Sequence, residues 1–159
     1  IRNLVPLATP LVRGLNAFSY LATRMACVRR MPDDVSKAYR APYDSWANRI
    51  ATLRFVQDIP LGPGDRSYDL VRWVEDHLPQ LRHVPMLICW GERDFVLDAA
   101  FLAGWRTRFP DAVVRTFPDA GHYVLEDAGA QIGPLVHAFL DAHPTVPVAS
   151  MTAGSMPGR

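Results

Sequence analysis

Asp94 and His122 have the residue types and the surroundings that acid–base chemistry requires. Each follows a short stretch of strand length, Asp94 after residues 84–90 and His122 after residues 112–117. A carboxylate held against an imidazole fixes the ring tautomer and stabilises the protonated ring, as a general base needs. We interpret the two as a candidate catalytic pair. The alternative is that Asp94 caps the following helix and His122 is an ordinary loop histidine.

The segments around this pair follow the order strand, helix, strand. Residues 84–90 (VPMLICW) form an unbroken apolar run, typical of a strand buried on both faces of a parallel sheet. A helix is predicted over residues 97–109 and a second strand over residues 112–117. Such strands run parallel with a right-handed crossover, and ligands bind at the edge where they end. We therefore expect an α/β fold in which Asp94 and His122 share that edge.

The motifs GERD (91–94) and AGH (120–122) resemble the acid and histidine ends of the α/β-hydrolase triad, whose chain order is nucleophile, acid, histidine. This resemblance implies that Asp94 is the acid and His122 the base. The nucleophile of that family lies upstream in a Gly-x-Ser-x-Gly or Gly-x-Asp-x-Gly turn, and neither pattern occurs in the sequence. The resemblance implies a partial α/β-hydrolase fold, the C-terminal half, which is expected to be inactive by itself.

The N-terminal part, residues 1–69, has no strand signal and predicts short helices joined by proline turns. Helices are expected over residues 11–29, over residues 32–40, and from Ser45, a candidate N-cap, to residue 58. Two arginines of the last segment, Arg49 and Arg54, are expected to be solvated. We interpret this part as a helical lid.

The remainder, residues 70–143, is expected to be the C-terminal part of the hydrolase core, with residues 144–159 as a flexible tail or linker. Asp65 or Ser67 is a candidate cap for a helix over residues 68–78, with a buried stripe formed by Leu70, Val71, Val74 and Leu78. Glu126 and Asp127 are expected to open the last helix, and Gly133-Pro134 to kink it or delay its start.

The lid carries a second resemblance. YRAPYD (39–44), WANR (46–49) and FVQDIP (55–60) are similar to the lid of haloalkane dehalogenase-like hydrolases, and in more detail to the β-lactone decarboxylases of bacterial olefin biosynthesis. This implies a carboxylate nucleophile outside the chain and a dehalogenation or lactone decarboxylation. Epoxide hydrolase and serine esterase chemistry stay open, because acid and base positions do not separate them.

Aromatic and apolar side chains near the pair are candidates for binding a hydrophobic substrate. Phe95 and Val96 follow Asp94, and Tyr123 follows His122. The lid tyrosines Tyr39 and Tyr43 could donate hydrogen bonds to a substrate oxygen, as paired tyrosines do in epoxide hydrolases. The alternative, which the helical spacing favours, is that their rings pack between the short helices.

Composition limits the partners. The formal net charge is +1, with acidic residues interspersed among the arginines, so neither nucleic acid nor an anionic membrane is expected as a partner. Two cysteines suggest no disulfide framework, which favours a cytoplasmic protein. No apolar run has the length of a membrane span, and no histidine has the paired spacing of a metal ligand. We expect no cofactor and no metal.

Two accounts of the missing nucleophile remain. The sequence begins without Met, and two buried-type strands alone would leave an exposed apolar edge. Both features favour a segment of a larger enzyme, in which the N-terminal half of the hydrolase or a fused domain completes the sheet. The alternative is a remnant without a nucleophile that acts as a non-catalytic binding module.

Overall fold

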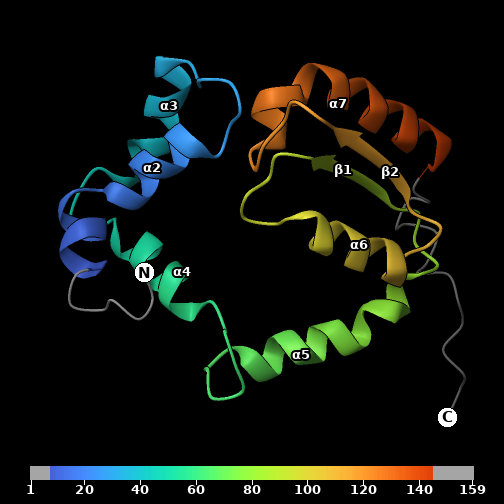
Figure 1. The fold of residues 1–159 in the computed structure, drawn as a ribbon, viewed down its shortest axis with the longest axis horizontal. Coiled ribbons are helices and arrows are strands. Elements are labelled where there is room, and N and C mark those ends of the chain that lie inside the picture. Colours follow the sequence, from blue (N-terminus) through green and yellow to red (C-terminus); the bar gives the residue numbers. More distant parts are fainter. Residues whose placement is uncertain (1–7, 145–159) are drawn as a thin grey trace, which may run out of the picture.

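The computed structural model describes residues 8–144, which form two groups of elements joined by a helix (Figure 1). The first group, here called the N-terminal helices, contains the π-helical turn η1 (Pro10–Gly14), α2 (Ala17–Met25), α3 (Asp33–Arg40), the 3-10 turn η2 (Ala41–Tyr43) and α4 (Ile50–Asp58). The joining part is α5 (Tyr68–His77) with the 3-10 turn η3 (Leu78–Leu81). The second group, here called the α/β unit, contains β1 (Leu87–Gly91), α6 (Ala99–Arg108), β2 (Val113–Phe117) and α7 (Val124–Ala142).

The two strands pair in parallel, in a register that runs from Leu87 opposite Val113 to Gly91 opposite Phe117. The predicted strand–helix–strand unit is therefore confirmed. Figure 1 shows α7 above the two strands and α6 below them. The core of the unit lies under α7, where Phe117, Ala120, Ala128 and Ile132 are buried together.

The expectation that the first strand is buried on both faces is wrong. The first four residues of β1, Leu87 to Trp90, are only half-buried, and only Gly91 is buried. Within the described residues the sheet has two strands, so one edge of β1 is unpaired. An apolar strand in the centre of a sheet is covered only when it has a neighbouring strand on each side.

Gly91 and Gly121 lie where the main chain of three segments comes together. A Cβ at Gly91 would lie 2.6 Å from the carbonyl oxygen of Ala120 and closer still to that of Gly121. A Cβ at Gly121 would lie 2.7 Å from the carbonyl oxygen of Ala26, at the end of α2. Because only glycine allows so close an approach of backbones, both positions depend on the absent side chain.

We expect Gly121→Ala to lower the free energy of unfolding by about 1–3 kcal/mol, because the added methyl must push main chain apart. The matched control is Gly129→Ala in α7, where an added Cβ meets nothing within 4 Å. That change should raise the free energy of unfolding by about 0.5–1 kcal/mol, since alanine favours a helix. Urea unfolding of the full-length protein measures both, and equal effects would contradict the close contact.

The single helix predicted over residues 11–29 is wrong, because η1 and α2 are separate. The chain breaks at Asn16, whose φ of 53° is left-handed. Asparagine tolerates this conformation better than other side chains. Its Nδ2 also donates a hydrogen bond to the carbonyl oxygen of Tyr43 at 3.0 Å, so the break is tied to η2.

Arg49 is not the solvated residue that its position predicted. Its guanidinium donates hydrogen bonds to backbone carbonyl oxygens of two segments, Tyr43 and Asp44 at 2.9 and 3.0 Å and Arg13 and Gly14 at 2.8 and 3.0 Å. The charge therefore neutralises the exposed carbonyl ends of η1 and η2 together. Charge-assisted hydrogen bonds of this kind are stronger than neutral ones, so Arg49 stabilises the packing of the N-terminal helices.

Further expectations on local structure need correction. Ser45 accepts a hydrogen bond from the N–H of Asn48 at 3.2 Å, but it caps a turn, and α4 begins only at Ile50. Helix α7 starts at Val124 and continues through Pro134, so its start is not delayed. The predicted tail or linker, residues 144–159, lies outside the described residues apart from Pro144.

The buried stripe predicted on α5 is wrong. Leu70 is 64% exposed, and Val71 and Val74 are also exposed. Figure 1 shows why, since α5 extends along the lower side of the molecule with its flank open. Ser67 lies at the N-cap of this helix without a side-chain hydrogen bond to it.

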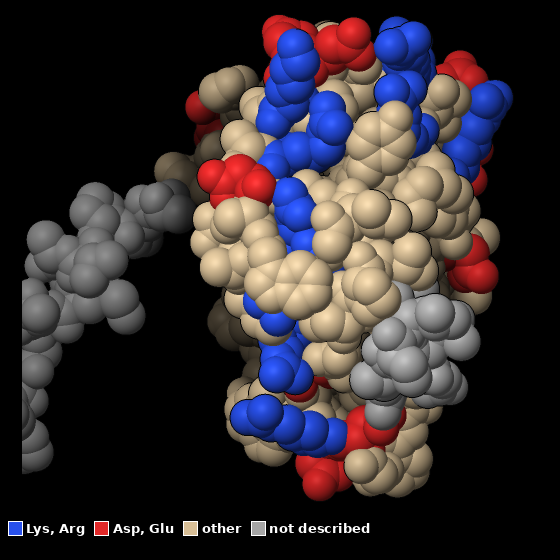
Figure 2. Space-filling model, turned by 90° about the vertical axis from the view of Figure 1, so that its left-hand side faces the viewer, with Lys and Arg blue, Asp and Glu red and all other residues tan. Residues whose placement is uncertain are grey.

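Figure 2 shows the side of the molecule formed by the N-terminal helices. Basic side chains follow a line down this face, interrupted by uncharged groups, with acidic side chains at its upper and lower ends. Large apolar side chains such as Leu15 and Phe55 are exposed on these helices.

Among residues 8–144, no helix combines the length and the hydrophobicity needed to cross a bilayer.

Candidate active site

Asp94 and His122 meet at the edge of the sheet where both strands end. Asp94 lies in the turn after β1, and His122 follows β2. Nδ1 of His122 lies 2.9 Å from Oδ2 of Asp94. The Asp94 side chain is 9% exposed and that of His122 31%, so the imidazole remains open on one side. The structure thus brings together the two residues that the sequence singled out.

The Asp94 carboxylate is fixed by its own turn as well as by His122. Its Oδ1 accepts hydrogen bonds from the backbone N–H groups of Val96 at 2.8 Å and Leu97 at 2.9 Å. Burial alone would raise the pKa of Asp94, but the hydrogen bonds from Leu97, His122 and Val96 outweigh it and hold the pKa below its usual value. Asp94 is therefore an ionised carboxylate at neutral pH.

The ionised carboxylate sets the tautomer of His122. A carboxylate without a proton can only accept hydrogen bonds, so the proton of a neutral imidazole must be on Nδ1. Nε2 then keeps its lone pair and can take up a proton from a neighbouring group. This is the arrangement of an oriented general base.

The loop that carries His122 is held by one hydrogen bond to the chain at the end of α2 and by another to α7. The N–H of Tyr123 donates to the carbonyl oxygen of Ala26 at 2.9 Å. The N–H of Gly121 donates to Oδ2 of Asp127 at 2.8 Å. Asp127 was expected only to open the last helix. No local sequence signal distinguishes that role from its hydrogen bond to the loop of His122.

Tyr39 and Tyr123 form a stacked pair beside the histidine. Their ring centroids are 5.3 Å apart, and the Tyr123 ring lies 5.9 Å from that of His122. The hydroxyl of Tyr39 donates to Oε1 of Glu126 at 2.7 Å. The pKa of Tyr39 is raised to about 12. This hydrogen bond is the largest cause, and burial and the negative charge of Glu126 add to it. The Tyr39 hydroxyl is thus engaged with α7, and Glu126 is a partner that the sequence did not reveal.

The other candidate binding residues differ in their surroundings. Phe95 is 61% exposed and Val96 is exposed as well, both immediately after Asp94. Tyr43 is half-buried in η2, where its carbonyl oxygen accepts hydrogen bonds from Asn16 and Arg49. The structure therefore places apolar surface next to Asp94 and aromatic rings next to His122.

The pKa values of both cysteine thiols are raised. Burial, with the charges of Asp127 and Glu126 added to it, raises the pKa of Cys27 to about 11. Burial also raises the pKa of Cys89, although Arg115 opposes it. Because the thiolate is the nucleophilic form, the raised pKa values lower the reactivity of both thiols near neutral pH. Within residues 8–144, no group of three His, Cys, Asp or Glu side chains could hold a metal ion.

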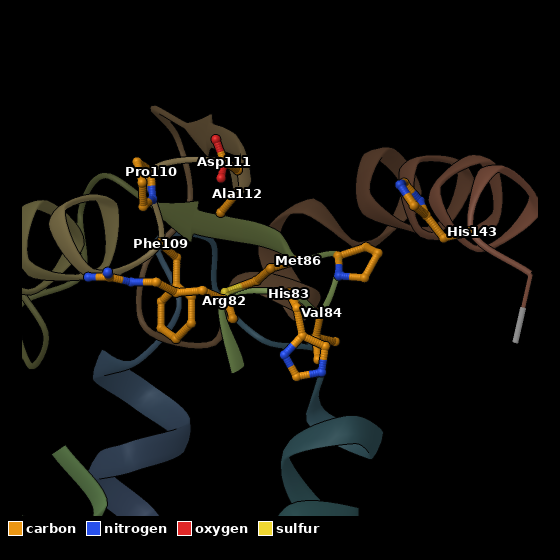
Figure 3. Close-up of a pocket in the computed structure, with 10 residues that line it drawn as sticks. Arg82, His83, Val84, Met86, Phe109, Pro110, Asp111, Ala112 and His143 are labelled. Atoms are coloured by element: carbon orange, nitrogen blue, oxygen red, sulfur yellow. The ribbon is translucent and has the colours of Figure 1, made fainter. Parts of the chain in front are cut away.

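A cavity of about 240 Å³ lies at the opposite edge of the sheet, before the strands begin (Figure 3). Its lining includes Val84 to Met86 ahead of β1, Phe109 to Ala112 ahead of β2, and His143. Figure 3 shows the side chains of His83, Asp111 and His143 set apart from one another. They do not form an acid–base pair, so this cavity has no part in the site of Asp94 and His122.

Three features of this chain occur together in the α/β-hydrolase fold. They are the parallel β1–α6–β2 unit, the helix after the second strand, and an acid and a histidine at the ends of the two strands. The chain has part of an α/β-hydrolase fold, its C-terminal half. No family model matches the sequence.

The chain is similar in sequence to two cis-3-alkyl-4-alkyloxetan-2-one decarboxylases. It is 54% identical to that of Shewanella oneidensis over 127 residues, which are 79% of this chain and 40% of the relative. It is 47% identical to that of Xanthomonas campestris pv. campestris over 133 residues, 84% of this chain and 44% of the relative. The chain thus spans less than half the length of the curated relatives that it matches.

Solved structures with the same fold include haloalkane dehalogenases. DbeA from Bradyrhizobium elkani superimposes with a TM-score of 0.74 at 22% identity, over 86% of this chain and 47% of the dehalogenase. DatA from Agrobacterium tumefaciens superimposes with a TM-score of 0.71 at 18% identity, over 84% of this chain and 46% of the dehalogenase. At this level of identity the likeness defines the fold alone.

Proposed function

We propose that this chain supplies the acid and the base of a β-lactone decarboxylase of the α/β-hydrolase fold. The observation that carries the proposal is the 2.9 Å hydrogen bond between His122 and Asp94 at the edge where the strands end. Identity of 54% to a cis-3-alkyl-4-alkyloxetan-2-one decarboxylase supports this reaction over others of the same fold. In this proposal the nucleophile, a carboxylate, lies in a part of the protein outside this sequence.

The proposed reaction converts a 3,4-dialkyl β-lactone into carbon dioxide and an alkene. Two ring bonds break, the one between the ring oxygen and C4 and the one between the carbonyl carbon and C3. The two products together therefore contain all the atoms of the lactone. The net reaction therefore consumes no water and needs no redox cofactor. Because the net reaction also consumes no proton, any proton that Nε2 of His122, oriented by Asp94, takes up from the reacting carboxyl group is returned before the products leave.

The N-terminal helices act as a lid in this proposal, with residues 1–69 as the lid and residues 70–143 as part of the core. Phe95, Val96 and Tyr123 then contribute apolar surface for the alkyl chains, and Tyr39 and Tyr43 form the lid side of the site. Support comes from the exposed apolar groups beside Asp94 and from the stacking of Tyr39 on Tyr123. We also propose a cytoplasmic location, which the two free thiols, Cys27 and Cys89, support.

Haloalkane dehalogenation is the second candidate, and the resemblance of residues 39–60 to the lid of haloalkane dehalogenase-like hydrolases supports it. In that reaction a carboxylate nucleophile displaces halide, and water activated by His122 cleaves the ester intermediate. The two reactions differ in whether water is consumed. Their products therefore distinguish them.

The test is to supply the full-length protein with a cis-3,4-dialkyl β-lactone and, separately, with a 1-haloalkane. We expect a cis-alkene by gas chromatography–mass spectrometry and no halide release. A β-hydroxy acid would identify a lactone hydrolase, and released halide a dehalogenase. Binding of the lactone without any product would favour a non-catalytic binding module.

A further inference from the structure

The carboxylate of Asp127 is the meeting point of three chain segments next to His122. Its Oδ2 accepts hydrogen bonds from the N–H groups of Val28 and Gly121, both at 2.8 Å. Its Oδ1 accepts from the N–H of Arg29 at 3.0 Å. The residue is only 9% exposed. A buried carboxylate with three backbone donors is strongly fixed, because each bond is charge-assisted.

These bonds are not those of an ordinary acidic residue at a helix start. Such a residue interacts with the N–H groups of its own helix, whereas Asp127 bonds to the loop before α7 and to the chain after α2. Burial would raise the pKa of Asp127, but the bonds from Val28, Gly121 and Arg29 outweigh it and keep the pKa below its usual value. Asp127 therefore stays ionised in the folded protein at neutral pH.

The bonds of Asp127 and of Tyr123 fix the two neighbours of His122. Gly121 is bonded to Asp127, and the N–H of Tyr123 is bonded to the carbonyl oxygen of Ala26. The missing side chain of Gly121 permits its backbone to lie against Ala26. The main chain on each side of His122 is thus held against residues 26–29.

We propose that Asp127 is a positioning residue for His122. By holding residues 120–123 against residues 26–29, its carboxylate keeps the imidazole in contact with Asp94. The inference rests on the proposed function of the Asp94–His122 pair and deepens it, since it makes the alignment of the base depend on the N-terminal helices.

The test is Asp127→Asn in the full-length protein. Asparagine has only one acceptor oxygen, so its amide group must face an N–H that now has no acceptor. We expect kcat to fall about 10–100-fold with KM changed less than twofold, because small misplacement of a catalytic group lowers the rate to that extent. The matched control is Asp119→Asn, which removes the same charge from the loop that carries His122, where Asp119 forms an exposed ion pair with Arg93 at 3.0 Å. The control should stay within twofold of wild type.

A second readout reports the geometry without turnover. In 15N-histidine-labelled protein, the Nδ1–H proton of His122 bonded to Asp94 should give a low-field resonance that disappears in His122→Gln. We expect Asp127→Asn to shift or broaden this resonance and Asp119→Asn to leave it unchanged. A purely structural role would lower the melting temperature of Asp127→Asn and leave both the resonance and kcat at their wild-type values, which would overturn the proposal.

If Asp127→Asn does not fold, Asp127→Glu decides the question. Glutamate keeps the charge but is longer by one methylene, so it cannot meet the three N–H groups in the same geometry. A folded Asp127→Glu protein with a wild-type resonance and kcat overturns the positioning role. Failure of the proposed decarboxylation is recognised separately, because the resonance tests the His122–Asp94 contact whatever reaction the protein catalyses.

Discussion

Replacing His122 with glutamine should reduce turnover by the full-length protein to the level of the remaining binding groups, a loss of about 10⁴-fold or more. Glutamine has a polar side chain of similar length but cannot take up a proton near neutral pH. The loss should appear in kcat, because in the proposed mechanism the imidazole acts on the reacting group and not on the alkyl chains. Product formation from the lactone, followed by gas chromatography–mass spectrometry, measures it.

The fold should survive His122→Gln. The histidine side chain contributes one hydrogen bond to Asp94, and the carboxylate keeps its two backbone donors, Val96 and Leu97. We expect the free energy of unfolding to fall by only about 0.5–1.5 kcal/mol. The matched control is His137→Gln, at an exposed position of α7, which should leave kcat unchanged. A kcat above a tenth of the wild-type value would remove His122 from the mechanism.

Asp94→Asn should lower kcat by about 10⁴-fold, through the tautomer of His122. The turn fixes how the new amide points, because Oδ1 accepts from Val96 and Leu97, and only an oxygen can occupy that place. The amide nitrogen must then face Nδ1 of His122, which becomes an acceptor. The proton moves to Nε2, and the atom that has to act as the base loses its lone pair.

The control for this change is Asp98→Asn. Asp98 caps α6 by accepting a hydrogen bond from the N–H of Ala100 at 2.9 Å, and it is exposed. Both variants lose one negative charge close to the end of β1, but only Asp94→Asn alters the histidine. Wild-type turnover by Asp94→Asn would mean that another acid orients His122.

The α/β unit could be predicted because its signals are local. The segments before Gly91 and before Pro118 predict two short strands, and the stretch between them has the length of one helix. Once the strands are parallel, Asp94 and His122 must lie at the same edge. The pair therefore followed from spacing and topology, without knowledge of any distant contact.

The errors concern residues whose surroundings are set by distant parts of the chain. Arg49 has the sequence context of a solvated helix residue, yet its partners Arg13 and Gly14 lie 36 and 35 positions away. The stripe of Leu70, Val71 and Val74 has the period of a buried face, but periodicity does not say whether another element covers it. Asp127 was missed for the same reason, since its role is defined by residues near the other end of the chain.

The separation of these partners bears on how the protein folds. The bonds from Val28 and Arg29 to Asp127 join positions 99 and 98 residues apart, whereas one short helix joins β1 to β2. Closing the longer loop costs more chain entropy before any contact compensates for it. The strands can therefore pair early from a local segment, while the loop of His122 acquires its last hydrogen bonds only when the N-terminal helices reach it. We therefore expect the Asp94–His122 pair to become aligned late in folding, so that a chain with a formed sheet can still lack the aligned pair.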